Sequence, residues 1–303
     1  MKRSFWKKLA ASIFGLILIV TGVYSFSKKK RNYGKYITGL FFHDPSRNLF
    51  ERCLKNLRKN KCNFISSEQV IEILQGKIEL PSRAVWITLD DGWKGNITEV
   101  IPVIKQYKVP ITIFVSTGPV ESRLPFWFST ARRFEEKLPI KYRGKALWKA
   151  SEEDRKRVIK ELEENITEKR DPEAMSISEI KDIASLSLVT IGNHTMSHVI
   201  MNHCTFEEMR SEIKQSQAKI KKWTGKEANC FAYPNGNFNQ KVVGFMKESG
   251  FILAVTTKKD FISLNSNIYE LSRFCVNDEA YFPETICQLT GAWGMAMDWI
   301  KNI

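Results

Sequence analysis

The chain has 303 residues, 43% hydrophobic and 26% charged, which is enough for one sizeable domain with a buried core. Its formal net charge is +14, but eight Lys and Arg residues and no acidic residue lie in the first 31 positions, which leaves +6 for the rest of the chain. That mild excess comes with no basic stripe interleaved with aromatics and no known nucleic-acid-binding module, so it argues against a nucleic-acid partner.

The first predicted element is an uncharged apolar run at residues 9–26. As a helix its 18 residues would extend about 27 Å, close to the hydrocarbon thickness of a bilayer. A basic flank at residues 1–8 precedes it, a basic linker at residues 27–35 follows it, and no convincing cleavage site is present. We therefore predict an uncleaved transmembrane signal anchor in membrane lipid rather than a cleaved signal peptide. The two flanks are almost equally basic, which leaves the orientation open.

From residue 36 onward, strand-like apolar runs alternate with helical patterns. The runs end at Phe42, Leu89, Val115, Ile191, Tyr233 and Val255. Three of the helices are predicted to begin with capping boxes, at Ser66 to Gln69, Ser176 to Glu179 and Thr205 to Glu208. Alternation of this length predicts a single α/β domain at residues 36–303, built as a parallel barrel.

The run at residues 84–89 (AVWITL) is a predicted buried strand that ends in Asp90, Asp91 and Gly92. Catalytic groups of α/β folds gather at such carboxyl ends of strands. One carboxylate can bind a metal ion there while its neighbour stays free to take a proton, because a divalent cation keeps its own ligand ionised. An isolated Asp-Asp-Gly is more often a solvated turn, so this interpretation depends on the next motif.

His194 and His198 lie four residues apart in a segment that follows another strand-like run. This spacing lets both imidazoles reach one metal ion, from a helix face or a tight loop. A lone pair of this kind is usually a surface or core feature. Together, the two motifs favour the site of a metal-assisted hydrolase.

Three motifs in this order resemble the NodB-like polysaccharide deacetylases, carbohydrate esterase family four. They are TLDDG at 88–92, GNHTMSH at 192–198 and FAYPNG at 231–236. The resemblance covers roughly residues 36–274 and implies a distorted (β/α)7 barrel behind the N-terminal transmembrane helix.

The resemblance also implies roles for individual residues. Asp90 is the general base, and Asp91, His194 and His198 are the metal ligands. The backbone N–H of Tyr233 donates to the oxyanion.

Many members of the family place a general-acid histidine downstream of these motifs, but this chain has none there. Its four histidines are His43, His194, His198 and His203. His43 ends a short apolar strand (LFFHD), which is similar to the permuted motif order of the poly-N-acetylglucosamine deacetylase branch. This similarity implies that His43 is the general acid.

The third motif also lacks the arginine that orients the base in many members, since Cys230 or Phe231 stands in its place. Arg273, in the strand-like segment 271–276 (LSRFCV), is a candidate substitute. A surface arginine at a strand end fits the pattern equally well.

Two histidines and one carboxylate suit Zn²⁺ with open positions, and the same set binds non-haem Fe(II) in oxygenases. In such oxygenases one histidine and the acid are close along the chain, whereas here the two histidines are the close pair. We therefore favour zinc, with other divalent ions as alternatives.

An insertion at residues 119–175 carries Phe126, Trp127 and Phe128, followed by a charged helical run at 151–170. We favour these aromatics as packing against the barrel over stacking on sugar rings at the groove edge. Residues 283–303 are predicted to form one amphipathic helix. The six cysteines show no CxxC spacing, and none is a candidate nucleophile or ligand.

Together with these residues, the resemblance implies a metal-dependent hydrolase that removes N-acetyl groups from N-acetylhexosamine units of a cell-envelope or extracellular polysaccharide or glycolipid. An O-deacetylase or a non-sugar C–N amidase on the same barrel stays open. A catalytically inactive, glycan-binding barrel is disfavoured because base, ligands and acid are all present. The expected substrate places the membrane-anchored catalytic domain outside the cytoplasm.

Overall fold

The computed structural model describes residues 3–32 and 34–301. Residues 1–2 of the predicted basic flank, residue 33 of the linker and the last two residues of the predicted domain lie outside it. The strands are β1 (Tyr36–Phe42), β2 (Asn63–Phe64), β3 (Ala84–Leu89), β4 (Ile111–Val115), β5 (Val189–Asn193), β6 (Cys230–Ala232), β7 (Leu253–Val255), β8 (Ile262–Ser263) and β9 (Phe274–Cys275). The α-helices are α1 (Phe5–Val20), α2 (Val23–Asn32), α3 (Arg47–Lys59), α4 (Ser67–Leu74), α5 (Ile101–Tyr107), α6 (Thr117–Ser122), α7 (Trp127–Arg133), α8 (Ala146–Lys149), α9 (Glu152–Glu164), α10 (Ile177–Ala184), α11 (Phe206–Thr224), α12 (Gln240–Glu248), α13 (Phe282–Leu289) and α14 (Ala292–Lys301). Short π- or 3₁₀-helical turns are η1 (Asn96–Val100), η2 (Glu135–Lys137), η3 (Ile140–Tyr142), η4 (Met201–His203) and η5 (Pro234–Gly236).

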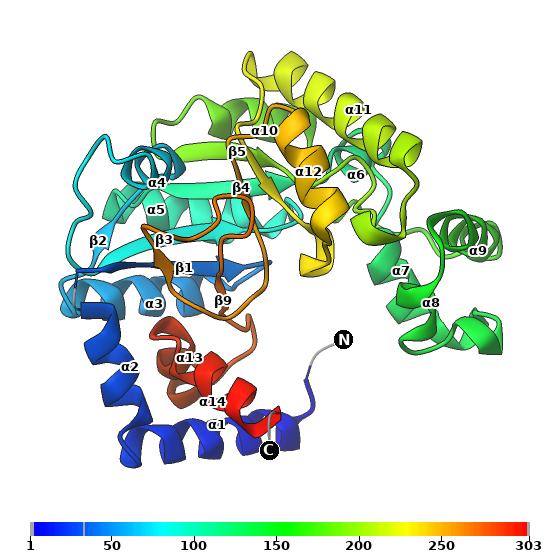
Figure 1. Ribbon diagram of the computed structural model, residues 1–303. Coiled ribbons are helices and arrows are strands. Elements are labelled where there is room, and N and C mark those ends of the chain that lie inside the picture. Colours follow the sequence, from blue (N-terminus) through cyan, green and yellow to red (C-terminus); the bar gives the residue numbers. More distant parts are fainter. Residues whose placement is uncertain (1–2, 33, 302–303) are drawn as a thin grey trace.

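One curled sheet forms the centre of this α/β fold, with helices around it (Figure 1). Its main path runs β7-β6-β5-β4-β3-β1-β8, while β2 pairs with β3 and β9 with β1. All these pairings are parallel except that of β1 with β8. The strands β3 and β4 are buried along their whole length, which explains their unbroken apolar sequences. Parallel pairing brings the carboxyl ends of β1, β3 and β5 to the same edge of the sheet.

The segment that leads into β9 contacts two strands far apart in this sheet, β7 at one end and β1 near the other. Leu271 forms a parallel bridge with Val255 of β7, and its N–H donates to the Ala254 carbonyl at 3.0 Å. Just beyond, β9 pairs with β1, and the Val276 N–H donates to the Phe41 carbonyl at 2.9 Å. The predicted strand at 271–276 is therefore in the right place, although only its centre has regular strand geometry.

The predicted strand ends hold to within two residues. Four of the six are confirmed, β5 continues two residues further to Asn193, and β6 ends at Ala232, one residue before Tyr233. All three capping boxes are present with both of their reciprocal hydrogen bonds. The charged run of the insertion forms α9.

The prediction of one helix at residues 283–303 is wrong, because the chain turns between α13 and α14. Gly291 lies there with φ +81°, a conformation that costs residues with a side chain energy. A Cβ at this position would also lie 2.5 Å from the Phe274 ring. The turn therefore requires glycine and folds α14 back.

The N-terminal apolar run is not one straight helix. No single helix in the described part of the chain is long and apolar enough to cross a membrane. The pair Phe5–Val20 and Val23–Lys30 meets that criterion only together, bent by 71° where Gly22 has φ +84°. The transmembrane anchor therefore stays a prediction.

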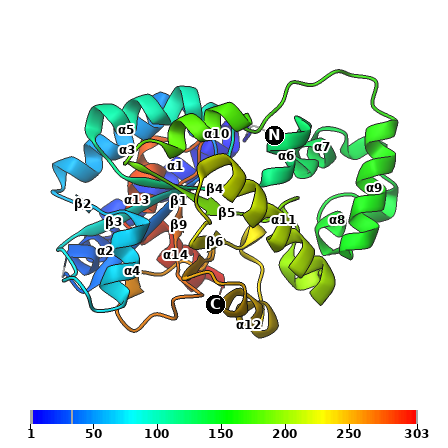
Figure 2. The same cartoon turned by 90° about the horizontal axis from the view of Figure 1, so that it is seen from above.

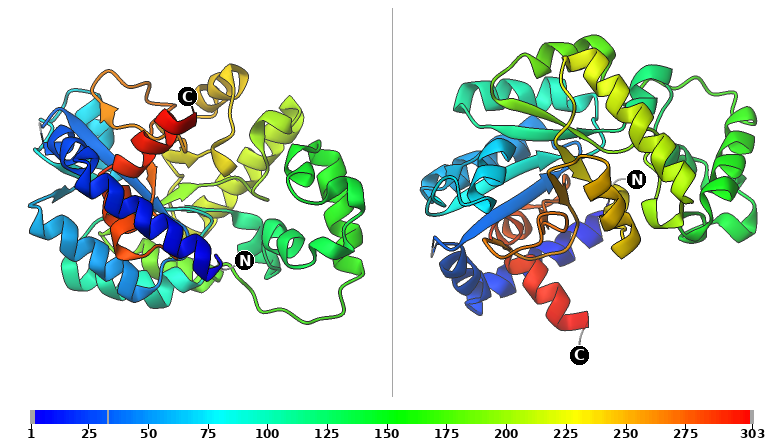
Figure 3. Two further views of the ribbon diagram at one scale, coloured as in Figure 1. Left: turned by 90° about the horizontal axis from the view of Figure 1, so that it is seen from below. Right: turned by 45° about the horizontal axis from the view of Figure 1, so that its top comes forward.

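Helix α1 packs along α13, as the blue and red ribbons of Figure 3 show. Ala11, Gly15 and Leu18 form its buried stripe. A Cβ on Gly15 would lie 2.7 Å from the carbonyl carbon of Pro283, so the two backbones touch there. The N-terminal helix is thus joined closely to the C-terminal end of the domain.

The insertion helices α7 to α9 stand at one side of the sheet (Figures 1 and 2). Phe126 and Phe128 are 0% and 5% exposed, and their rings stack with centroids 5.1 Å apart. Phe126 also packs on Trp93, just after β3, at 4.6 Å. The predicted packing role is confirmed for Phe126, while Phe128 packs on it and also lines the cavity described below, and Trp127 is half-buried.

Candidate active site

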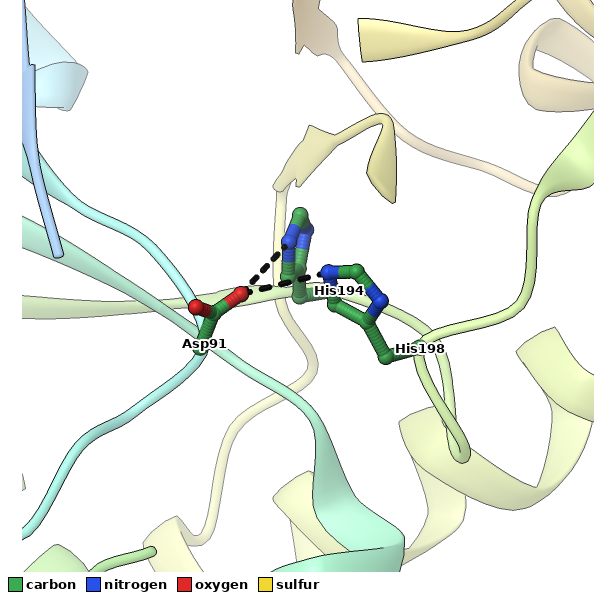
Figure 4. A group of neighbouring side chains, drawn as sticks. All are labelled: Asp91, His194 and His198. Atoms are coloured by element: carbon green, nitrogen blue, oxygen red, sulfur yellow. Dashed lines mark ion pairs between the residues drawn. The ribbon is translucent and has the colours of Figure 1, made fainter. Parts of the chain in front are cut away.

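Three side chains converge at the carboxyl ends of β3 and β5. Asp91 follows β3, and His194 and His198 lie in the loop after β5. Both imidazole Nε2 atoms are 3.3 Å from Asp91 Oδ1, and each of the three side chains is almost fully buried (Figure 4). One ligand atom from each residue lies within 4.8 Å of the others, so the structure brings the three predicted metal ligands together.

Unusual backbone conformations aim these ligands. Asp91 has φ +71°, Thr195 has +66° and His198 has +55°. Positive φ is uncommon for residues other than glycine and concentrates at functional sites. It lets the chain turn sharply after β3, and it reverses the loop so that His198 comes back beside His194.

The donor set fits a divalent ion. His194 Nδ1 lies 2.7 Å from the Ala232 carbonyl, which can only accept, so Nδ1 carries a proton and the Nε2 lone pair faces Asp91. Burial lowers the pKa of His198, which also favours the neutral, metal-binding form. Burial would raise the pKa of Asp91, but the contacts with both histidines outweigh it and hold this pKa well below its ordinary value. Two imidazole nitrogens and one carboxylate oxygen around one point are the ligands of a catalytic zinc-type site.

Further contacts that the sequence did not reveal support the ligands. The Trp93 indole N–H donates to Asp91 Oδ2 at 2.8 Å. The Trp127 indole N–H donates to the carbonyl of His198 at 3.2 Å. The turn after β3 thus fixes the orientation of the Asp91 carboxylate, and the insertion fixes the backbone at His198.

Glu212, on α11, binds the backbone of the loop that carries His194 and His198. Its carboxylate accepts the N–H groups of Met196 and Ser197 at 3.0 and 2.8 Å, and the Ser197 hydroxyl at 2.5 Å. Glu212 is 2% exposed and lies next to the buried Ile213. An acidic residue on the apolar face of an amphipathic helix was the available sequence signal, and it was missed.

Glu212→Gln should lower metal affinity about tenfold, because the amide places its own donor against the N–H groups of the loop, and such supporting partners typically matter to that extent. Metal titration by isothermal calorimetry measures the effect. Glu207→Gln, on the exposed face of the same helix, is the matched control and should bind metal normally. Equal affinities for the two variants would exclude a supporting role for Glu212.

Arg273 clamps the predicted base. Its Nη1 and Nη2 donate to the two carboxylate oxygens of Asp90 at 2.7 and 2.9 Å, and Nη1 also donates to Thr88 Oγ1 at 2.7 Å. Burial would raise the pKa of Asp90, but Arg273 outweighs burial and lowers it. Because Arg273 is 0% exposed, the alternative of a surface arginine is wrong.

Arg273→Gln should reduce kcat/KM and move the acid limb of its pH profile upward by about one unit or more, since a neighbouring arginine lowers a carboxyl pKa by roughly that amount. Without the guanidinium, burial dominates and raises the pKa of Asp90, so the ionised base is lost at higher pH. The pH dependence of kcat/KM measures the shift, and metal content serves as the control. An acid limb that stays in place would show that Arg273 has no influence on the base.

His43 directly follows β1 with a partly exposed side chain, and two acids, Asp44 and Asp278, lie beside it. Its Nδ1 lies 3.9 Å from Asp278 Oδ2, and the N–H groups of His43 and Asp44 both donate to the Asp278 carboxylate. Burial raises the pKa of Asp278, and burial together with Asp278 raises the pKa of Asp44 to about 6. Asp278 lies in a loop with no motif around it, so the sequence offered no signal for it.

A single cavity of about 680 Å³ unites these groups. Its walls include six predicted site residues: His43, Asp90, Asp91, His194, His198 and Tyr233. Arg273 does not line it, and acts on it through Asp90.

The oxyanion role predicted for the Tyr233 N–H is wrong. This N–H donates to the Val255 carbonyl at 3.1 Å, because the hydrogen-bond ladder between β6 and β7 continues one residue past β6. Pro234 has no N–H. Asn235 follows with φ +57°, lines the cavity, and has an N–H that bonds to no acceptor in the part of the chain that the structure describes.

Comparisons with known proteins identify the family of the chain. The profile of the family described as Polysaccharide deacetylase matches residues 77–254. A poly-beta-1,6-N-acetyl-D-glucosamine N-deacetylase of Staphylococcus aureus is 23% identical over 266 residues, which cover 85% of this chain and 73% of that protein.

Solved structures show the same fold. The deacetylase PplD of Streptococcus pyogenes, in complex with acetate, aligns with a TM-score of 0.62 and 18% identity over 84% of this chain and 98% of that one. IcaB from Ammonifex degensii aligns with a TM-score of 0.58 and 20% identity over 86% of this chain and 97% of that one. Since the family profile matches more than half of the chain and contains Asp91, His194 and His198, the chain belongs to the polysaccharide deacetylase family.

Proposed function

We propose that the chain is a metal-dependent N-deacetylase that acts on N-acetylhexosamine units of a cell-envelope or extracellular polysaccharide or glycolipid. The observation that carries this proposal is the single cavity into which the ligand triad, the clamped Asp90 and His43 all open. The family is generally metal-dependent, and the curated relative named above is a poly-N-acetylglucosamine N-deacetylase. In this proposal the 271–275 segment is the seventh strand of a distorted (β/α)7 barrel.

Asp91, His194 and His198 would hold the metal, for which zinc is our first choice and other divalent ions are alternatives. Bound there, the ion supplies a Lewis acid for the amide carbonyl and for the attacking water. The protein supplies the remaining groups.

Each step then uses a group of this chain. Asp90, kept ionised by Arg273, accepts a proton from the attacking water. The N–H of Asn235 donates to the oxygen on which negative charge develops, in place of the Tyr233 N–H. His43 donates a proton to the leaving amine nitrogen, and its Nδ1 lies 3.9 Å from Asp278 Oδ2. The products are acetate and a free amino sugar.

Acetate release from N-acetylglucosamine oligomers tests the proposal. We expect release that stops on chelation and returns when zinc is added. Release only from O-acetyl esters would make the protein an O-deacetylase. Oligomer binding without any release would identify a glycan-binding barrel. Either outcome would overturn the N-deacetylase assignment.

His43→Ala should lower kcat about 100-fold, the usual contribution of a positioned acid, while metal affinity stays unchanged. The expectation follows from the position of His43 in the cavity and outside the ligand triad. Steady-state kinetics and metal titration of the same preparation separate the two effects. A wild-type rate in this variant would remove His43 as the acid.

We further propose that the N-terminal helices anchor the domain to a membrane and that the catalytic domain lies outside the cytoplasm. Support comes from the exposed apolar side chains of α1, which are Phe5, Trp6, Ile13, Leu16, Ile17 and Val20. The basic residues at 28–31 follow within α2.

A further inference from the structure

A second cavity, of about 650 Å³, lies between the insertion and the core of the domain. Helices α7 and α8 line one side, and the η4 and η5 turns line the other. Arg132 and Asn235 line both this cavity and the catalytic one, so the two are neighbours with a shared wall. We refer to the second cavity as the side groove.

The lining of the side groove suits an uncharged sugar ring. Trp148 is half-buried in its wall, packs on Trp127 with ring centroids 5.6 Å apart, and lies under the Arg132 guanidinium at 5.5 Å. An indole supplies a rigid apolar surface of the kind on which ring faces pack. The side chains that surround it include three amides, Asn202, Asn235 and Asn237. An aromatic surface with a few hydrogen-bonding groups is the usual composition of a small-ligand site.

The charge of the side groove is predominantly positive. Arg132, Lys145 and Lys149 line it against one acid, Glu135, whose carboxylate already accepts the Gly144 N–H at 2.6 Å. Positive charges repel the ammonium group that deacetylation creates on a sugar, and leave an acetamido group unaffected. The groove can therefore distinguish product units from substrate units.

We propose that the side groove binds sugar units that flank the reacting residue in an oligomer, and that it favours acetylated units over deacetylated ones. This inference rests on the proposed function. Its consequence is a spaced pattern of deacetylation. Once a unit of the oligomer carries a free amine, that unit binds the side groove more weakly, so its neighbour is less often placed in the catalytic cavity.

The first test compares N-acetylglucosamine hexamer and dimer as substrates. The wild type should show a higher kcat/KM for the hexamer, and Trp148→Ala should lower the hexamer-to-dimer ratio about tenfold, in line with a lost aromatic contact. Trp148→Phe should restore most of the ratio. Because both substrates undergo the same chemistry, the ratio cancels any disturbance that the truncation transmits to the His198 loop through Trp127.

The second test uses hexamers that carry glucosamine next to the reacting unit. The wild type should process them roughly tenfold more slowly than fully acetylated hexamers, an effect that added salt weakens. The double variant Lys145→Glu and Lys149→Glu should remove or reverse this preference. Lys141→Glu, an exposed position on the same insertion outside the groove, is the matched control and should keep the wild-type preference.

The outcomes separate the two proposals. A wild type that releases no acetate from any oligomer refutes the proposed function, and this inference with it. A wild type that releases acetate with the same length ratio in all Trp148 variants, or with a preference that the double variant leaves intact, refutes the side groove alone.

Discussion

Asp90→Asn should lower kcat by about 10³-fold while the protein binds its metal as the wild type does, since proton transfer by a positioned base contributes roughly that much. The amide fits the same space but cannot accept the proton of the attacking water. Asp90 is not among the three converging side chains, and Arg273 donates to both of its carboxylate oxygens. Kinetics on acetylated oligomers and metal titration of the same protein check both parts.

The control for Asp90→Asn is a stability measurement, because Asp90 is the charged partner of the buried Arg273 guanidinium. Replacing a charged partner of a buried guanidinium can destabilise the domain, so the thermal unfolding midpoint of Asp90→Asn belongs beside the rate. Loss of activity in a folded, metal-loaded variant is the expected combination. A folded variant with near-wild-type kcat would show that another group takes the proton.

His194→Ala should abolish activity and weaken metal binding by about a hundredfold or more. The substitution removes one of the three proposed ligands, together with its hydrogen bond to the Ala232 carbonyl. The wild-type ring is fixed by the Ala232 carbonyl, with Nε2 directed at Asp91. Calorimetric titration with zinc reports the affinity directly and does not depend on turnover.

His203→Ala is the matched control for metal binding, because His203 lies close along the chain but outside the triad, with Nδ1 bonded to the Ala150 carbonyl. It should bind zinc with wild-type affinity. If His194→Ala bound zinc equally well, the triad would not be the metal site.

The convergence of Asp91, His194 and His198 beside Asp90 could be predicted from sequence because these residues follow two buried strands, all of them directly except His198, which comes four residues after His194. The strands that end at Leu89 and near Ile191 are parallel and close in the sheet, so their ends must meet. The oxyanion donor could not be predicted in this way. The apolar run ends at Tyr233, but this pattern does not show whether the N–H of its last residue is still bonded in the ladder between β6 and β7, and in the structure it is.

The supporting residues were harder to predict for a different reason. Glu212 and Asp278 are single acids without a motif, and each acts on a loop distant in sequence. Arg273 reaches Asp90 only because its segment contacts both β7 and β1, which no local pattern shows. The turn at Gly291 was not predicted because the need for glycine there depends on the Phe274 ring, which packs against this position only in the folded protein.

The position of Arg273 in that late segment has a kinetic consequence. The three converging side chains follow β3 and β5, and the carbonyl that fixes His194 belongs to Ala232 of β6, so all of these groups precede the segment after β8 in the chain. The arginine arrives only when the segment after β8 docks between β7 and β1. In the proposed mechanism, a fluctuation that frees this short stretch would leave the Asp91, His194 and His198 cluster in place but remove the guanidinium from Asp90. Hydrogen exchange of the Leu271 and Val276 amides, which are bonded to β7 and β1, would report how often this segment detaches from the sheet.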